Sequence, residues 1–329
     1  MLTDLQRVTN EPRAQDGLWF SDAAREALLA LLRELRARKY DFVTATPSTH
    51  ARVVKRSTRQ QARALRDVLG WSLPFDPRVV DADLLAILKA AGAIEERADG
   101  LLKARIRVSA VEGTLFIHSA FPTLAEDSVF LGPDSYRFAQ LITANIQPGT
   151  QRILDYGAGA GVGGIVAARA AGKAHLTLAD VNPKALFLAS INAEHAGIDH
   201  RTVHVSEPRE VEGAFDAMVT HPPFMIDADR RAYRDGGDLY GGQLSLEWVL
   251  QGRKLLAPGG RLILHTGVSI VDGRDVLLEA LRERLPSTGV HMDYRELDPD
   301  IFGEELDNEV YADVERIAAV GLVLTRTEA

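Results

Sequence analysis

Hydrophobic and polar residues alternate with two different periods, and the pattern changes near residue 150. In the first part, Ser21 or Asp22 could cap an amphipathic helix, and Gly92 ends a shorter one. Glu112-Gly113 is typical of a turn between two strands. The predicted elements are helices at 21–39, 52–66 and 83–91 and strands at 102–108 and 114–118. Helices followed by a small hairpin indicate a winged-helix-like accessory domain at about residues 40–125.

From about residue 150, short buried strands alternate with helices. The predicted strands lie at 152–156, 174–180, 201–206, 214–220 and 260–266, and the predicted helices lie at 162–171, 183–196, 242–256 and 273–284. Two further stretches, 289–297 and 316–326, are joined by an acidic loop. Such alternation specifies a mostly parallel sheet with helices on both faces, whose ligands lie at the carboxyl ends of the strands. The sequence therefore predicts an α/β domain with a site at that edge.

The composition narrows the class of protein. The chain has 329 residues, of which 46% are hydrophobic, and this length favours two unequal domains. Cysteine is absent, which excludes disulfides, thiolate catalysis and cysteine-rich metal sites, and fits a reducing compartment. The first residues lack a basic stretch leading into an apolar one, and no apolar run approaches the roughly 20 residues that cross a bilayer. We therefore expect a cytoplasmic protein that has no contact with a membrane.

Charge is distributed unevenly along the chain. Residues 1–150 contain 20 basic and 18 acidic residues, whereas residues 151–329 contain 18 basic and 28 acidic residues, a net charge of −10. The overall charge of −8 argues against a protein that coats nucleic acid without selectivity. Cations recur at three- and four-residue steps in the predicted helix at 52–66, namely Arg52, Lys55, Arg56, Arg59, Arg63 and Arg66. They could contact RNA phosphate or an acidic protein, or simply form a solvated helix face.

The run from Ile153 to Gly161 passes from a strand into glycines at alternate positions and then into a helix. Small residues let the backbone approach a ligand closely, and the helix N-terminus supplies amide groups and a positive dipole end. Asp180 ends the next strand, where a carboxylate can accept hydrogen bonds from both hydroxyls of a ribose. A dinucleotide such as NAD would use similar features. Asp155 distinguishes NAD from a cationic ligand. Its carboxylate would repel the pyrophosphate of NAD but would attract a ligand that has an ammonium and a sulfonium group.

A second motif, His221-Pro222-Pro223-Phe224, directly follows a buried strand. Two prolines cannot extend a central strand, so the chain must turn away at the carboxyl end of that strand, beside the cofactor. Phe224 can stack on a planar acceptor. His221 can accept a hydrogen bond through one ring nitrogen or act as a base, and a purely structural role is the alternative. No nearby residues have the spacing of metal ligands, so no metal is predicted.

These two motifs, in this order and spacing, resemble the first and fourth motifs of S-adenosylmethionine-dependent N-methyltransferases of the small-domain, HemK-like group. His221 stands where that group usually has Asn or Asp before Pro-Pro. The resemblance covers roughly residues 128–326 and implies a Rossmann-like, seven-stranded class I methyltransferase sheet whose last two strands form an edge hairpin. It implies an S-adenosylmethionine-binding domain at residues 128–329. The pattern of helices and a hairpin upstream leaves residues 1–127 as an N-terminal α+β, winged-helix-like accessory domain, which we expect to present the substrate.

The resemblance also implies roles for individual residues. The implied cofactor-binding residues are Asp155, Tyr156, Gly157, Ala158, Gly159, Gly161 and Asp180, with Ser206 and Glu207 as candidates near the adenine or as solvated loop residues. The implied catalytic residues are His221, Pro222 and Phe224, and the implied substrate contacts are Tyr136, Pro223 and Arg234. Asp134 or Ser135 could cap the helix that begins there. The glycine-rich stretch 227–242 resembles a lid over the acceptor, with a plain flexible connection as the alternative.

The favoured function is methyl transfer from S-adenosylmethionine to a nitrogen of a macromolecule, either a protein glutamine or an RNA base. The acceptor would stack on Phe224, in line with the methyl group, while His221 holds or deprotonates it. Methylation of a small metabolite at O, N or C, with His221 as base, is the second hypothesis. A catalytically inactive binding protein is the third, and the presence of Asp155, Gly157–Gly161 and Asp180 argues against it, because an inactive copy has no reason to keep a cofactor site.

Overall fold

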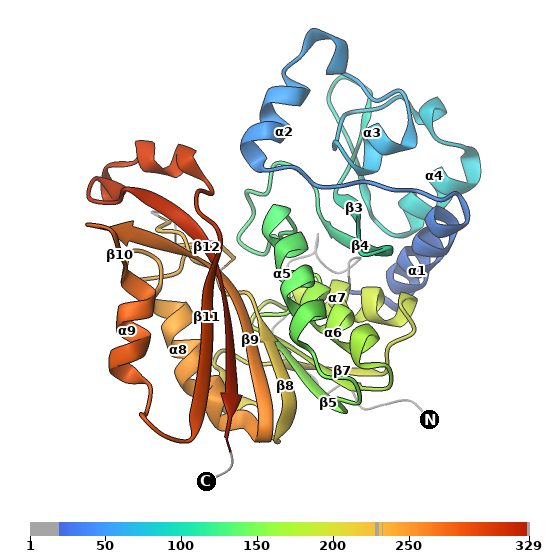
Figure 1. Cartoon of the computed structure of the whole chain (residues 1–329). Helices are drawn as coiled ribbons and strands as arrows, with labels where there is room; N and C mark the ends of the chain where they lie inside the picture. The colour runs from blue at the N-terminus through green and yellow to red at the C-terminus, as the bar shows by residue number, and fades with distance from the viewer. Residues whose placement is uncertain (1–19, 228–229, 232, 328–329) are drawn as a thin grey trace.

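The central sheet occupies the C-terminal part of the computed structural model, which describes residues 20–227, 230–231 and 233–327. Its strands are β5 (Arg152–Tyr156), β6 (His175–Asp180), β7 (His200–His204), β8 (Phe215–Thr220), β9 (Leu256–Val271), β10 (Arg274–Asp275), β11 (Val290–Asp298) and β12 (Arg316–Arg326). The main path runs β11-β12-β9-β8-β5-β6-β7, and β10 pairs only with the end of β9 (Figure 1). Strands β5 to β9 are parallel to one another, and β11 and β12 form the antiparallel edge hairpin. The predicted fold class is confirmed, with β10 as an additional two-residue strand.

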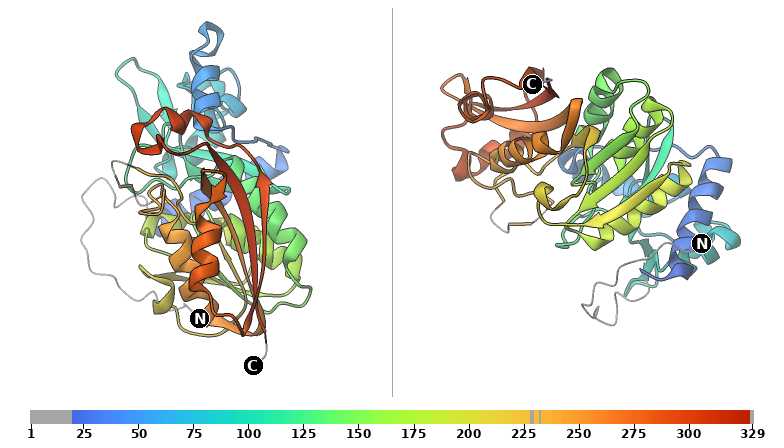
Figure 2. Two further views of the ribbon diagram at one scale, coloured as in Figure 1. Left: turned by 60° about the vertical axis from the view of Figure 1, so that its left-hand side comes forward. Right: turned by 90° about the horizontal axis from the view of Figure 1, so that it is seen from below.

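Helices cover both faces of this sheet (Figure 2). They are α5 (Pro133–Asn145), α6 (Val162–Ala171), α7 (Pro183–His195), α8 (Gln243–Gly252) and α9 (Val276–Arg284), with the 3₁₀ turns η3 (Pro208–Glu210) and η4 (Arg253–Leu255). On β5, Ile153 packs into the apolar cluster of α5, α6 and α7, whereas Leu154 packs into the cluster of α8 and α9. A strand buried on both faces is typical of a parallel sheet between two helical layers. None of the helices in the described part of the chain is long and apolar enough to cross a membrane.

The N-terminal lobe consists of short helices and two small hairpins. Its elements are α1 (Asp22–Ala37), α2 (Pro47–Val54), η1 (Ser57–Arg59), α3 (Leu65–Leu69), η2 (Pro77–Val79), α4 (Ala82–Ala90), β1 (Ile94–Glu96), β2 (Leu102–Ala104), β3 (Ile106–Val111) and β4 (Thr114–Ser119). The helices predicted at 21–39 and 83–91 are confirmed as α1 and α4. Ser21 caps α1 by accepting from the Ala24 amide at 3.1 Å. The predicted hairpin turn is present, because β3 and β4 pair around Glu112 and Gly113, which both have positive φ.

The prediction of one continuous helix at 52–66 is wrong. Helix α2 ends at Val54, and α3 begins only at Leu65. Between them the Ala62 side chain is buried, and its amide donates to the Pro74 carbonyl at 2.8 Å. An amide that pairs with a distant carbonyl cannot take part in a helical ladder, so this long-range contact interrupts the helix.

The single strand predicted at 102–108 is also wrong in its extent. Strand β2 pairs with β1, whereas β3 pairs with β4. Arg105 separates the two strands, and its amide donates to the Ala93 carbonyl at 2.8 Å while its carbonyl accepts from the Ala120 amide at 3.2 Å. The chain therefore changes partners at Arg105, and the alternating pattern of side chains continues across the change.

One buried apolar cluster joins the lobe to the α/β domain. It includes Leu28 of α1, Phe116 of β4 and Leu188 of α7. The buried amide of Asn192 on α7 accepts from the Ile117 amide at 2.9 Å and donates to the Ile117 carbonyl at 3.1 Å, so that α7 supports the β3-β4 hairpin. The division into domains at residues 127 and 128, and the winged-helix type of the lobe, stay predictions.

Candidate functional site

One cavity of about 460 Å³ brings the two sequence motifs together at the carboxyl ends of β5, β6 and β8. Parallel register places the ends of these strands at the same edge of the sheet. The residues singled out by the sequence that line this cavity are Asp155, Tyr156, Gly157, Ala158, Gly159, Asp180, Ser206, His221, Pro222, Pro223, Phe224 and Arg234. Within the described ranges, no three His, Asp or Glu side chains are grouped as ligands of a metal ion would be.

The turn between β5 and α6 needs residues without side chains. Gly157, Gly159 and Gly161 all have positive φ, at 69°, 53° and 79°. A Cβ atom on Gly157 would lie 2.7 Å from the Trp248 ring, whereas one on Gly159 would meet nothing closer than 4.0 Å. Gly159 therefore borders open space in the cavity, and α6 begins three residues later, at Val162, with amide groups in its first turn.

Asp180, at the end of β6, is held in a fixed orientation by backbone amides. Its Oδ2 accepts from the Gly159 amide at 2.9 Å and its Oδ1 accepts from the Asn182 amide at 2.8 Å. Asn182 caps α7 by accepting from the Lys184 amide at 3.0 Å. Burial raises the pKa of Asp180, and the two amides oppose that change. Each carboxylate oxygen keeps a further lone pair, which suits the hydroxyl groups of a ligand.

Asp155 lies deeper, with only 2% of its surface exposed. Its Oδ2 accepts from the Gly164 amide at 2.7 Å. A Cβ on Gly164 would lie 2.8 Å from the Cβ of Asp155 and 2.6 Å from Leu176, so only glycine leaves room for this carboxyl group. Burial raises the pKa of Asp155 to about 8. At neutral pH the carboxyl group is largely protonated, and a cationic ligand beside it would lower the pKa again.

His221 has a defined tautomer. Its Nδ1 lies 2.9 Å from the His265 carbonyl oxygen. A carbonyl oxygen only accepts, so Nδ1 carries the proton of the neutral ring and Nε2 is left as an acceptor. Burial lowers the pKa of His221, and the Asp134 carboxyl group opposes this change. The ring is therefore neutral at pH 7, with Nε2 able to accept a hydrogen bond or a proton.

Asp134 is a cavity residue that the sequence suggested only as a helix cap. It is 2% exposed, and its carboxylate pairs with Arg137 at 3.1 Å. Arg137 in turn pairs with Asp298 of β11 at 2.6 Å. Burial raises the pKa of Asp134, while His221 and Arg137 oppose that change. An acidic residue in the first turn of a helix is common, so the sequence contains no signal that would separate this role from capping.

Phe224 forms a flat wall of the cavity. Its ring lies on β9, where a Cβ on Gly267 would be 2.3 Å from the ring. It stacks beside His221 with centroids 5.8 Å apart and an interplanar angle of 27°, and Phe302 approaches it at 5.9 Å. Phe302 directly precedes η5 (Gly303–Asp307) and lines the cavity too. Phe302 was not predicted, because nothing in its sequence segment indicates contact with the distant His221-Pro222-Pro223-Phe224 motif.

The glycine-rich stretch after Phe224 folds back onto the motif. The Gly236 amide donates to the Met225 carbonyl at 2.8 Å, and a Cβ on Gly241 would be 2.3 Å from the Phe224 carbonyl oxygen. The Tyr233 hydroxyl donates to the Thr123 carbonyl at 2.7 Å, which ties the stretch to the N-terminal lobe. Residues 228, 229 and 232 lie outside the described residues. The lid role of this stretch stays a prediction.

Three predicted side chains have other partners or positions. Arg234 lines the cavity, but its guanidinium pairs with Glu305 at 2.7 Å and with Asp227 at 3.5 Å. The remaining two do not line the cavity. The Tyr136 hydroxyl accepts from the Thr44 amide at 2.9 Å, and Glu207 pairs with Arg209 at 2.6 Å. Gly161 lies behind the cavity wall, where its Cβ position faces Ala189 at 3.2 Å.

A family model described as "Methyltransferase small domain" matches residues 135–281, which include both motifs and the strands that carry them. Residues 135–281, a little under half of the chain, are therefore similar to this family. The match agrees with the predicted family, enzyme class and methyl donor.

Curated relatives of the methyltransferase domain act on two kinds of macromolecule. The release factor glutamine methyltransferase of Deinococcus radiodurans is 32% identical over 164 residues, which are 47% of this chain and 55% of the relative. The ribosomal RNA small subunit methyltransferase C of Shigella flexneri serotype 5b is 33% identical over 87 residues, 26% of this chain and 25% of the relative. The chain thus spans about half or less of the length of these relatives. The solved structure of M. jannaschii TYW2 in complex with AdoMet has a TM-score of 0.46 at 14% identity, over 71% of this chain and 94% of that chain.

Proposed function

We propose that this protein transfers a methyl group from S-adenosylmethionine to a nitrogen atom of a macromolecular acceptor, either a protein glutamine or an RNA base. The shared cavity carries the proposal. The glycine turn and Asp180 border the same space as His221 and Phe224, so a donor bound by the first pair would face an acceptor held by the second. Two relatives, named for a release factor and for ribosomal RNA, support a macromolecular acceptor.

The residues on the cofactor side fit S-adenosylmethionine. The two oxygens of Asp180 are oriented by the Gly159 and Asn182 amides and suit the two hydroxyls of a ribose. Asp155 suits a ligand with positive charge and disfavours a pyrophosphate. When bound, S-adenosylmethionine supplies an electrophilic methyl group on a positively charged sulfur. Asp155 therefore favours this ligand over a dinucleotide, whereas Asp180 suits the ribose of either.

The acceptor side fits a planar group that carries an NH2. The lone pair of an amide or of a base nitrogen is delocalised, so holding the nitrogen in line with the methyl group supplies much of the rate. Nε2 of His221 accepts a hydrogen bond from the NH2 group and takes the proton that the nitrogen loses when it is methylated. The carboxyl group of Asp134 favours the charged imidazolium that forms. Phe224 provides the flat apolar surface on which the acceptor rests.

A small acceptor is the second candidate function. The observation that favours it is the neutral His221 with Nε2 free of protein partners among the described residues, because such a base suits the deprotonation of a small hydroxyl or amine. It differs from the first candidate in the size of the acceptor and in the atom that can be methylated.

Calorimetric titration with S-adenosylmethionine and, separately, with NAD tests the proposal. We expect micromolar affinity for S-adenosylmethionine and none for NAD. Asp180→Ala should weaken binding by about 1–3 kcal/mol, because a buried hydroxyl pair loses its acceptor. Glu207→Ala is the matched control, since Glu207 is an acid of the next loop that does not line the cavity, and it should change nothing. Absence of binding, or equal effects of the two variants, would contradict the proposal.

Transfer of a tritiated methyl group then identifies the class of acceptor. The purified protein is incubated with tritiated S-adenosylmethionine and, in separate reactions, with total RNA, a ribosomal and release-factor protein fraction, and a small-molecule extract. Label in RNA or in protein supports the first candidate. Label that passes a small-pore filter supports the second.

A further inference from the structure

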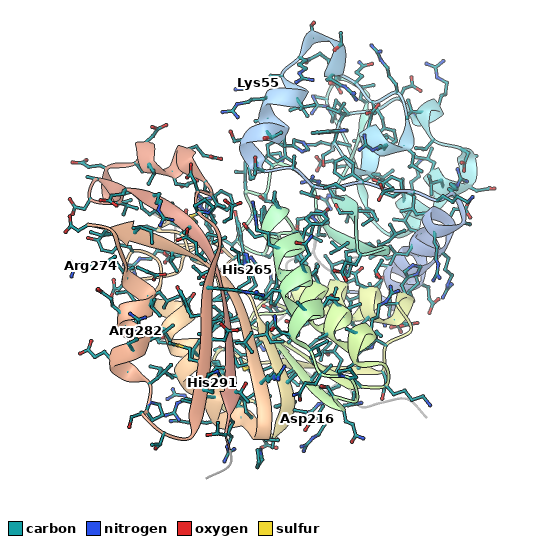
Figure 3. The ribbon with its side chains drawn as sticks, viewed as in Figure 1. Lys55, Asp216, His265, Arg274, Arg282 and His291 are labelled. Atoms are coloured by element: carbon teal, nitrogen blue, oxygen red, sulfur yellow. The ribbon has the colours of Figure 1, made fainter. Side chains whose placement is uncertain are left out.

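A dense positive charge lies beside the catalytic cavity on the side of the N-terminal lobe. Residues 47–66 contain six Lys or Arg residues and no Asp or Glu, and Pro47 lines the cavity. Arg59 pairs with Asp67 at 2.9 Å, and the Arg66 guanidinium lies over a phenylalanine ring. The remaining cations are exposed and have no carboxylate partner among the described residues, namely Arg52, Lys55, Arg56 and Arg63. Figure 3 shows Lys55, which directly follows α2, projecting outward from the lobe.

A second cavity, also of about 460 Å³, lies next to this segment. Arg59, Arg97 and Lys103 line it, together with the rings of His50 and Trp71. Positive side chains interleaved with aromatic rings are typical of surfaces that bind single-stranded nucleic acid, where cations contact phosphates and rings stack on bases. In this groove the half-buried Trp71 provides a ring, whereas the His50 ring is buried. Arg97 pairs at 3.0 Å with Asp99, which lines the groove too, and Lys103 adds a further cation.

Two buried polar atoms in this groove have no hydrogen-bond partner among the described residues. They are Nδ1 of His50, a side chain that is 1% exposed, and Nε1 of Trp71. Nε2 of His50 is already used, because it lies 3.0 Å from the Trp71 carbonyl oxygen. Burial and the positive charge of Arg107 and Lys103 lower the pKa of His50 to about 4, so its ring is neutral. Unpartnered buried polar groups in native proteins are few, and the polar edge of a base would satisfy these two atoms once the side chains that cover them move aside.

The groove adjoins the catalytic cavity. Phe121 and Pro122 line both, so the two spaces lie next to each other at this point of the chain. The Phe121 ring packs on the His50 ring with centroids 4.1 Å apart and an interplanar angle of 31°. The next residues continue along the mouth of the catalytic cavity, where Leu124 is 69% exposed. A strand in the groove would thus have its next base at the entrance to the acceptor site.

The opposite side of the catalytic cavity has the opposite charge. Residues 296–315 contain nine Asp or Glu residues and no Lys or Arg, and Phe302 of this segment lines the cavity. Figure 1 shows α2 above the upper end of α5 and this segment, in red, to the left of it. Acidic side chains repel a phosphate backbone, so a polyanion is confined to the side of the N-terminal lobe.

We propose that the groove between residues 47–66 and Lys103 binds the phosphate backbone of a single-stranded RNA and delivers one base to His221 and Phe224. This inference rests on the proposed function and selects RNA from its two macromolecular acceptors. We do not expect duplex RNA to be the substrate, because a paired base cannot enter a cavity until it is extruded from the stack. The rings of the groove favour bases over an acidic peptide, which would use the cations alone.

Fluorescence anisotropy with a fluorescein-labelled single-stranded RNA of about 15 nucleotides, without S-adenosylmethionine, tests the inference. The triple variant Arg52→Glu, Lys55→Glu, Arg56→Glu should weaken binding at least tenfold. It should also lower the slope of log K against log salt by about 2, because each contact with a single-strand phosphate contributes about 0.7. The matched control is Arg282→Glu, Arg284→Glu, Arg295→Glu, which reverses three exposed cations on α9 and β11. Arg282 is labelled on the far side of the molecule in Figure 3, and this control should bind RNA within twofold of wild type.

Unchanged RNA affinity in the first variant, or an equal loss in the control, overturns the inference. Displacement of the RNA by an equal concentration of a peptide of 15 glutamates also overturns the inference, because the groove would then bind any polyanion. Failure of this inference and failure of the proposed function are distinguishable by calorimetry. The groove variant should bind S-adenosylmethionine as wild type does, whereas a protein that binds RNA but not S-adenosylmethionine would refute the proposed function and leave the groove intact.

Discussion

The cofactor side and the acceptor side of the catalytic cavity are built in different ways. The cofactor side is formed by two consecutive strand–helix units. Its carboxylates, Asp155 and Asp180, accept hydrogen bonds from amides of the same or the preceding unit. The acceptor side combines β8, β9, α5 and the segment before η5, which contribute His221, Asp134 and Phe302 from distant positions. The first arrangement follows from local chain geometry, and the second exists only after the sheet has formed.

Burial has the same physical effect on both sides. It raises the pKa of Asp155 and Asp180 and lowers the pKa of His221, so in each case it disfavours the charged form. The consequence differs. A cationic donor would restore the charge of Asp155, whereas the acceptor side needs His221 to stay neutral until it takes a proton. The two sides should therefore respond to mutation and to pH independently.

The largest expected effect separates the two sides by mutation. His221→Ala should lower the rate of methyl transfer by about 10²–10⁴-fold, because the positioned base is lost. The affinity for S-adenosylmethionine should stay within about twofold of wild type, since His221 belongs to the acceptor side. Single-turnover transfer of tritiated methyl and calorimetric titration measure the two quantities. His221→Asn should keep more activity than His221→Ala, because an amide can still accept a hydrogen bond. An equal loss of donor affinity would show that the two sides are not separate.

A smaller effect tests how tightly the cofactor side is packed. Gly164→Ala should lower the free energy of unfolding by about 1–3 kcal/mol, because the new Cβ would overlap Asp155 and Leu176. Gly303→Ala is the control, since a Cβ there would meet only Asp300 at 3.9 Å, and it should have little effect. Urea denaturation measures both. If Gly164→Ala were as stable as Gly303→Ala, the close fit around Asp155 would not exist.

The smallest expected effect sharpens the comparison through pH. The pKa of Asp155 is raised to about 8 without ligand, so binding of a cation must release a proton below that pH. Affinity for S-adenosylmethionine should rise about 20-fold from pH 6.5 to 8.5, and Asp155→Asn should abolish the change. Calorimetry in buffers of different ionisation enthalpy counts the released protons. At saturating donor, the rate of transfer should instead fall as the pH is lowered, with a midpoint below the ordinary pKa of a histidine, because burial lowers the pKa of His221. A flat affinity profile in the wild type would remove Asp155 from the binding of the cation.

Most of the fold was predictable from the sequence, because its strands and helices have strong local periods. Strand β5 and helix α6 begin and end at the predicted residues. The errors arose where a distant contact overrides the local pattern. Ala62 interrupts a run of good helix formers by pairing with Pro74, and Arg105 changes partner within a continuous alternation. Propensity contains no information about such partners.

The residues of the cavity also differ in how well the sequence predicted them. Most of the predicted cofactor residues line the cavity. A glycine turn that follows a strand and a carboxylate at the end of a strand both lie at the carboxyl edge of a parallel sheet. Tyr136 and Glu207 do not line the cavity, because their side chains have partners in the N-terminal lobe and in their own loop.

The sequence by itself determined the alternation of strands and helices, the glycine turn with Asp155 and Asp180, and the position of His221 beside it. Each of these depends on residues within one strand–helix unit, where chain geometry leaves few alternatives. Only the tertiary structure decided that Asp134 faces His221, that the His265 carbonyl selects its tautomer, and that a basic groove adjoins the cavity at Phe121 and Pro122. These features depend on contacts between segments far apart in the chain, and the burial that sets their protonation exists only in the folded protein.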